Sequence, residues 1–181
     1  MKIIAITTPK VTSDDLPIIR GLIGKGIDVI HLRKPDSCID ECRDLLLRLT
    51  DKERGRIVIH DYPELYDEFQ LLGIHINKNV TSFPSGYSGL RTRSCHSFEE
   101  VRMYKGDYDY LFLSPIFNSI SKQGYLSGFT HDELVRAYEE GIIDRKVVAL
   151  GGVTFDKREY LKGLGFGGAA MIGALYNTSQ I

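Results

Sequence analysis

The sequence predicts a single α/β domain over residues 1–181, in which eight parallel strands close into a compact (β/α)8 TIM barrel. Eight strand-like runs alternate with helical or short linking segments, the pattern of right-handed parallel crossovers. The first run is apolar and rich in β-branched residues, as strands covered on both faces are. No GxGxxG motif follows the first run, where an open doubly wound sheet places its phosphate loop. We therefore favour the closed barrel over that alternative.

The first half of the chain contains four strand-like runs. Residues 2–8 form an apolar, β-branched run that ends at Pro9, and a helix capped by Ser13 or Asp14 follows until Gly24. The same strand and helix patterns then return in alternation. Their ranges are 28–33 (strand), 39–52 (helix), 56–61 (strand), 63–70 (short helix) and 73–76 (strand).

The second half begins with an exception. Residues 78–90 are rich in Ser, Gly, Pro and Asn and carry no helical stripe, so we expect a loop in place of the fourth helix. At 181 residues the chain is short for this fold, which usually takes about 200 or more, and the lost helix accounts for part of the difference. The remaining ranges are 91–95 (strand), 98–105 (helix), 109–114 (strand), 132–140 (helix), 146–150 (strand), 155–161 (helix) and 168–172 (strand).

Charge and composition argue against several classes of partner. The formal net charge is -1 and the 23 basic residues are scattered, which argues against nucleic acid and anionic membranes. We see no signal peptide and no apolar run of about 18 residues, so we expect a cytoplasmic protein. Three cysteines cannot form a closed disulfide framework, and no CxxC motif or nearby pair of histidines indicates a metal. A small-molecule ligand fits best, and the sequence is compatible with a homo-oligomer.

The residues that follow the strands suit an anionic, phosphorylated ligand. In such barrels the chemistry lies at the carboxyl ends of the strands. Gly151 and Gly152 follow the seventh strand, and Ile172 and Gly173 follow the eighth. Backbone N–H groups at these turns can approach phosphate oxygens. The alternative is that the glycines only form tight turns.

Three more candidates carry charge or can titrate. Arg33 and Lys34 end the second strand, and because adjacent strand residues point to opposite faces, we expect only one, Arg33, to face the mouth as an anion ligand. His96 is the candidate proton handler, since its ordinary pKa of about 6.5 allows either protonation state. Lys122 lies in a polar loop, residues 117–125, that can close over a charged ligand. Solvated charges, a structural histidine and an ordinary loop are the competing interpretations.

Six motifs then occur in a characteristic order: IHLRKP, IHDYPELYDEFQLLGIHIN, SCHSFEE, LSPIFNSISK, VVALGGV and GFGGAAMIGAL. With them the chain resembles the thiamine phosphate synthase and thiazole tautomerase family over nearly its whole length. The resemblance implies a (β/α)8 barrel and one of two activities. Synthases join a hydroxymethylpyrimidine diphosphate to a thiazole phosphate with Mg²⁺, releasing pyrophosphate. Tautomerases move a proton within a carboxylated thiazole phosphate and need no metal.

The resemblance also implies where the two activities differ. The synthases have Gln-x-Arg on the second strand and Asn-Asp after the third, where this chain has His31 and Arg33, then His60 and Asp61. Val80 stands where a second metal-binding Asp is expected. Mg²⁺ prefers several oxygen ligands, so the loss of a carboxylate favours the tautomerase.

We therefore expect a tautomerase-type enzyme without a cofactor, acting on a small phosphorylated thiazole. The alternatives are a thiamine phosphate synthase that binds Mg²⁺ through Asp61, and a non-catalytic paralogue that binds thiamine phosphate. The resemblance implies that His96 is the histidine that transfers the proton. Ser119, Ser121 and Lys122 match the family's Thr-x-Thr-Lys pattern, with Ser in place of Thr. The expected site residues are His96 and Lys122 (catalytic), Gly151, Gly152, Ile172 and Gly173 (phosphate), and His31, Arg33, Lys34, His60, Ser119 and Ser121 (anion or substrate).

Overall fold

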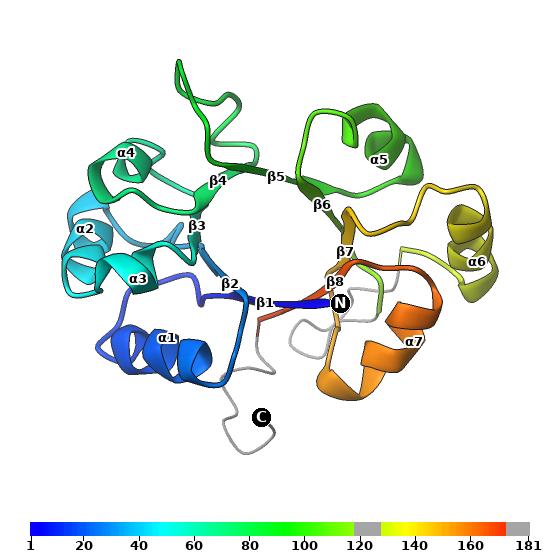
Figure 1. Ribbon diagram of the computed structural model, residues 1–181, viewed down its shortest axis with the longest axis horizontal. Helices are drawn as coiled ribbons and strands as arrows, with labels where there is room; N and C mark the ends of the chain where they lie inside the picture. The colour runs from blue at the N-terminus through cyan, green and yellow to red at the C-terminus, as the bar shows by residue number, and fades with distance from the viewer. Residues whose placement is uncertain (118–127, 173–181) are drawn as a thin grey trace.

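The computed structural model describes residues 1–117 and 128–172, and its eight strands form a closed parallel barrel in chain order (Figure 1). Each strand pairs with the next, and β8 returns to β1 in the register Lys2 with Gly168. The predicted (β/α)8 barrel is thereby confirmed. The strands are β1 (Lys2–Ile6), β2 (Val29–Leu32), β3 (Ile57–Ile59), β4 (Gly73–Ile76), β5 (Leu90–Cys95), β6 (Tyr110–Leu113), β7 (Val147–Ala149) and β8 (Gly168–Met171).

The helices surround the barrel on its outside (Figure 1). No helix of the described residues is both long and apolar enough to cross a membrane. The helices are α1 (Asp15–Gly24), α2 (Ile39–Leu47), α3 (Asp51–Arg54), α4 (Leu65–Phe69), α5 (Phe98–Tyr104), α6 (His131–Glu139) and α7 (Arg158–Gly163), with a 3-10 turn, η1 (Phe155–Lys157), before α7.

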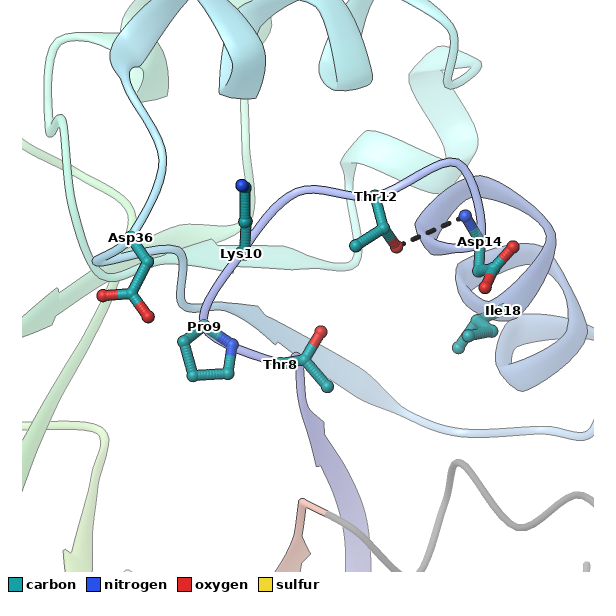
Figure 2. Close-up of a pocket in the computed structure, with 7 residues that line it drawn as sticks. All are labelled: Thr8, Pro9, Lys10, Thr12, Asp14, Ile18 and Asp36. Carbon is teal, nitrogen blue, oxygen red and sulfur yellow. Dashed lines mark hydrogen bonds between the residues drawn. The ribbon is translucent and has the colours of Figure 1, made fainter.

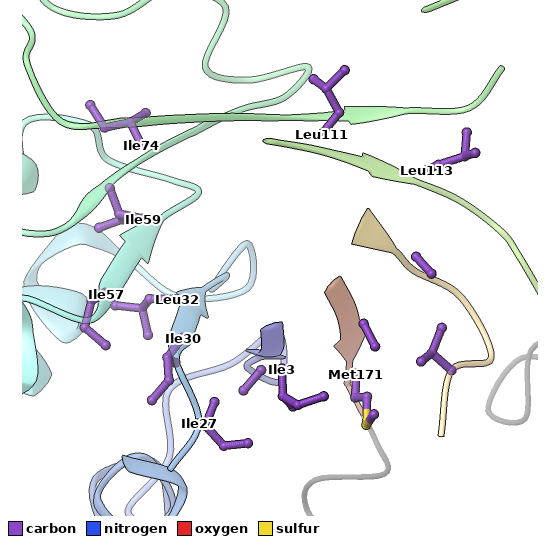
Figure 3. Packing of buried hydrophobic residues seen from close by; sticks show 14 of the residues in the cluster. Ile3, Ile27, Ile30, Leu32, Ile57, Ile59, Ile74, Leu111, Leu113 and Met171 are labelled. Atoms are coloured by element: carbon purple, nitrogen blue, oxygen red, sulfur yellow. The ribbon is translucent and has the colours of Figure 1, made fainter. Parts of the chain in front are cut away.

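Alternation along the strands divides the buried side chains between two cores. Ile30 and Leu32 of β2 belong to the large apolar cluster between the barrel and its helices (Figure 3). Successive strand residues point to opposite faces, so His31 between them lies inside the barrel. The interior also holds a smaller apolar cluster that includes Val58 and Phe112. Most strands are therefore apolar on both faces except where polar residues enter the barrel, while β5 also carries Arg93 on its outer face, over the Tyr104 ring of α5.

The connection from β4 to β5, residues 77–89, contains no helix, as predicted. Aromatic side chains cover this part of the barrel instead. The Tyr87 hydroxyl donates to the Leu90 carbonyl (2.6 Å) and accepts the Ile74 N–H (2.7 Å), while the Phe83 ring stacks on that of Tyr87 at 4.8 Å. Val80 is also buried in this layer.

The single helix predicted over residues 39–52 is wrong. The structure ends α2 at Leu47 and begins a separate helix, α3, after Thr50. The Thr50 side chain accepts the Glu53 N–H, and the Glu53 carboxylate accepts the Thr50 N–H, which together form a capping box. This reciprocal pair satisfies the free amides of a new helix start and so favours the break.

Candidate active site

Arg33 lies exposed at the carboxyl end of β2. Its backbone is held to the end of β1, because its N–H donates to Thr7 Oγ1 (3.0 Å) and the Thr7 hydroxyl donates to the Arg33 carbonyl (3.1 Å). Within residues 1–117 and 128–172 the guanidinium contacts no carboxylate. Its charge acts on His60 and His75 inside the barrel. A fixed backbone with an available guanidinium suits the binding of an anion at the mouth.

Lys34 points the other way and is buried against Asp15, the first residue of α1. Both side chains are only 1% exposed. Lys34 Nζ also donates to the Lys10 carbonyl at 2.9 Å, and Thr12 N–H donates to Asp15 at 2.7 Å. This geometry matches the prediction that only one of the two adjacent residues, Arg33, faces the barrel mouth. The ammonium of Lys34, however, is engaged under the β1–α1 loop, so the structure does not bring it to the ligand side.

His96 follows β5 and is exposed. Its Nδ1 lies 3.0 Å from the Ser114 carbonyl oxygen and its backbone N–H donates to the Glu100 carboxylate at 2.5 Å. A carbonyl can only accept, so we assign the proton of the neutral ring to Nδ1. Nε2 then carries a lone pair that is available to a ligand. Ser97 caps α5 by accepting the Glu100 N–H, which fixes the backbone beside His96.

The Gly151–Gly152 turn after β7 lies against the segment that follows β6. Gly151 has φ +91°, and a Cβ there would come within 2.8 Å of Pro115 Cα, so only glycine fits without strain. The Phe117 N–H donates to the Gly151 carbonyl at 3.0 Å. Neither glycine N–H has an acceptor among the described residues. His96 contacts Ser114 at the start of the same segment. The segment that follows β6 therefore contacts both the predicted proton-transfer residue, His96, and the predicted phosphate-binding turn.

The structure describes one of five further predicted ligand residues. Ile172 directly follows β8 and is 45% exposed. The remaining four predictions, Ser119, Ser121, Lys122 and Gly173, lie outside the described residues.

His31 and His60 lie inside the barrel rather than at its open mouth. They are 0% and 5% exposed, and His31 Nδ1 lies 2.7 Å from His60 Nε2. A third histidine, His75 of β4, stacks on His60 with ring centroids 4.0 Å apart. Burial lowers the pKa of all three, that of His75 to about 3, so the rings are neutral near pH 7. The sequence showed no nearby pair of histidines, whereas the fold brings these three together from distant positions in the sequence.

The Mg²⁺ site that the resemblance implies does not fit these residues. Asp61 is half-buried after β3 and accepts the Lys34 N–H at 3.2 Å. Val80 is 7% exposed in the outer core and offers no oxygen from its side chain. Among the described residues, Asp61 belongs to no group of three potential metal ligands. A lone carboxylate leaves a hard divalent ion short of protein oxygen ligands.

An open hollow of ≈ 390 Å³ lies beside the end of β1 (Figure 2). It is formed by the β1–α1 loop, Ile18 of α1 and Asp36, and the Thr12 hydroxyl accepts the Asp14 N–H across its rim at 3.3 Å. None of the predicted site residues lines it. We therefore place the candidate site at the strand ends and not in this hollow.

Known proteins resemble the chain over most of its length. The profile of the family described as thiamine monophosphate synthase matches residues 3–175. A thiamine-phosphate synthase from Phocaeicola vulgatus is 26% identical over 169 residues, which cover 86% of this chain and 80% of that protein. One from Bacteroides thetaiotaomicron is 25% identical over 169 residues, with the same coverage.

A solved structure gives a higher identity. The crystal structure of a thiamine phosphate pyrophosphorylase from Bacteroides thetaiotaomicron is 42% identical, covers 98% of this chain and 85% of its own, and superposes with a TM-score of 0.88. Fold, motif order and family profile agree. The chain therefore belongs to the thiamine monophosphate synthase family.

Proposed function

We propose that this chain is a thiazole tautomerase-type enzyme, which shifts a proton within a carboxylated thiazole phosphate to give the aromatic ring. The hydrogen bond from His96 Nδ1 to the Ser114 carbonyl carries the proposal. It leaves Nε2 as a base at the mouth, able to take a proton from one ring carbon of the substrate. The same nitrogen, or solvent, then returns a proton to the other position, so that the reaction is a net isomerisation.

We assign binding groups to the phosphate and to the carboxylate of the substrate. The free amides of Gly151 and Gly152 would bind the phosphate, next to Ile172 and Gly173. Arg33 would neutralise the carboxylate of the substrate, and Lys122 would approach from the polar loop with Ser119 and Ser121. Neutralising the carboxylate stabilises the negative charge that develops when the neighbouring ring carbon loses its proton.

A second candidate is the synthase reaction, which couples the pyrimidine diphosphate to the thiazole phosphate. The names of the matched relatives favour it, including that of the protein 42% identical to this chain. Asp61 would then hold Mg²⁺ beside the diphosphate. Against it stands Val80, whose buried side chain supplies no second oxygen ligand.

The two Bacteroides thetaiotaomicron proteins also bear on this choice. One is 25% and the other 42% identical to this chain over most of its length, so we infer that they are two different proteins. This chain is more similar to the second of them. The names of both proteins denote the synthase reaction, so the greater similarity to the second protein does not by itself favour the tautomerase.

The test runs both reactions on one purified protein. Conversion of the non-aromatic thiazole phosphate carboxylate is followed by NMR, and thiamine phosphate formation is measured with pyrimidine diphosphate, thiazole phosphate and Mg²⁺. We expect the first reaction alone, reduced about 10²- to 10⁴-fold by His96→Gln. His131→Gln is the matched control, because His131 lies exposed on α6 and bonds Tyr160.

Rapid Mg²⁺-dependent thiamine phosphate formation would instead establish the synthase. Tight binding of thiamine phosphate with no turnover in either assay would establish the non-catalytic paralogue. If His96→Gln retains full tautomerase activity, the proton-transfer role of His96 is excluded.

A further inference from the structure

Three histidines meet inside the barrel, one from each of the successive strand units β2, β3 and β4. The ring centroids of His31 and His60 lie 4.9 Å apart, those of His60 and His75 4.0 Å, and those of His31 and His75 5.5 Å. One nitrogen of each ring lies within 4.8 Å of the others. Exposure is 0%, 5% and 1%, so the group is screened from bulk water.

The hydrogen bonds of these rings bear on which nitrogen of each can bind an ion. His31 Nε2 shares a hydrogen bond with the Tyr110 hydroxyl, which leaves Nδ1 as the nitrogen that faces His60. His75 lies 2.8 Å from Thr92 Oγ1 and 2.9 Å from Ser94 Oγ through its two nitrogens, so an ion must take the place of one of these two hydroxyl contacts. Histidines that bind metals characteristically bond an oxygen through the other ring nitrogen, which fixes their orientation.

An ion requires a modest rearrangement of this group. His31 Nδ1 and His60 Nε2 are 2.7 Å apart, a distance that accommodates one shared proton. Two nitrogens each about 2.0–2.1 Å from a tetrahedral Zn²⁺ lie about 3.3 Å apart, so an ion in place of the proton widens the pair by about 0.6 Å.

One ring must also turn. His60 and His75 are stacked at 14°, and because imidazole lone pairs lie in the ring plane, parallel rings do not converge on one point. His60 follows the last residue of β3 and is the most exposed residue of the three. Its carbonyl is held by Asn77 Nδ2 at 2.6 Å, so the ring can rotate while the backbone stays in place.

We propose that His31, His60 and His75 bind one divalent transition-metal ion, Zn²⁺, inside the barrel, with a fourth position open toward the mouth beside His60. Three neutral nitrogen donors select Zn²⁺ over Mg²⁺, which prefers oxygen. Three protein ligands leave one position for water or an anion. The positive charge of Arg33, at the mouth and acting on His60 and His75, favours an anion there. The ion takes no part in the proton transfer assigned to His96.

The experiment measures Zn²⁺ binding by the chelator-treated full chain. Calorimetry should give one site per chain, and Co²⁺ in its place should give the intense visible bands of a four-coordinate ion. The chain has five histidines, so every one can be tested. We expect His31→Gln, His60→Gln and His75→Gln each to weaken binding at least ~100-fold, whereas His96→Gln and His131→Gln bind as the wild type does.

A milder variant covers the case in which a buried His→Gln substitution unfolds the barrel. Tyr110→Phe keeps the ring and removes only the hydroxyl that holds His31, so it should fold and bind Zn²⁺ about 10-fold more weakly. The proposal fails if the folded wild type binds no Zn²⁺, if Co²⁺ gives only the weak bands of a six-coordinate ion, or if binding depends on His96 or His131 and not on the buried three.

Discussion

Replacing Lys34 tests whether this residue supports the fold or the ligand. Lys34→Met removes the ammonium and leaves the Asp15 carboxylate, 1% exposed, with only its bonds from Thr12. Breaking a buried ion pair at one partner costs about 3–5 kcal/mol, since the remaining charge stays in a medium that solvates it poorly. With a urea dependence of about 2 kcal/mol per M, the midpoint of unfolding should fall by about 1.5–2.5 M.

The assay is urea unfolding followed by circular dichroism. Asp15→Asn combined with Lys34→Met should cost less than the sum of the two single substitutions, because the pair is lost as a unit. Arg102→Met is the matched control: it breaks the pair with Glu140, whose side chains are 55% and 54% exposed, and should cost less than about 1 kcal/mol. A Lys34→Met protein of unchanged stability that binds phosphorylated ligand more weakly would refute this reasoning and restore Lys34 as a ligand residue.

Three further outcomes follow from buried contacts. Gly151→Ala should destabilise the fold by about 1–3 kcal/mol because of its φ of +91° and its approach to Pro115, whereas Gly163→Ala, with open space around it, should not; thermal unfolding checks both. In chelator-treated protein the free energy of unfolding should fall as the pH drops from 6.5 toward 5, since the unfolded chain takes up a proton at His75 that the native ring, with a pKa of about 3, does not. His75 alone contributes about 2 kcal/mol over this window, so His75→Gln should make the urea-derived profile shallower, while the buried His31 and His60, whose pKa values are also lowered, maintain part of the slope. Tyr87→Phe should cost about 1–3 kcal/mol in urea unfolding because it leaves the Ile74 N–H without its acceptor, and an unchanged midpoint would show that water replaces the hydroxyl.

The strands could be predicted from the sequence because their signal is local. Most of the eight runs are short, apolar and bounded by polar or glycine-rich residues, and such a run must be buried on both faces. The polar run that forms β5 is the exception. The helix-free segment before β5 could be predicted for the same reason, because its signal is the composition of the segment itself. The break before α3 was missed although its signal is present: Thr50 followed by Glu53 is the Thr-x-x-Glu pattern of a capping box.

The site could be predicted only in part, because spatial neighbours are not sequence neighbours. The strand-end rule identified Arg33 and His96 as exposed residues at the mouth. The partner of Lys34 could not be found, since Asp15 lies 19 residues earlier and comes under β2 only when α1 packs. His75 was missed for a similar reason. It shares its inward direction with His31 and His60, but that common direction is visible only once the strand registers are known.

The helix-free connection between β4 and β5 shows that the eight units of this barrel need not be equivalent. A closed sheet requires every strand, whereas its outer covering requires only enough apolar surface to exclude water. Here the stacked rings of Phe83 and Tyr87 provide that surface within thirteen residues, 77–89. A barrel can thus become shorter by exchanging a regular element for two large side chains, while the order of its strands and the positions of their carboxyl ends stay intact.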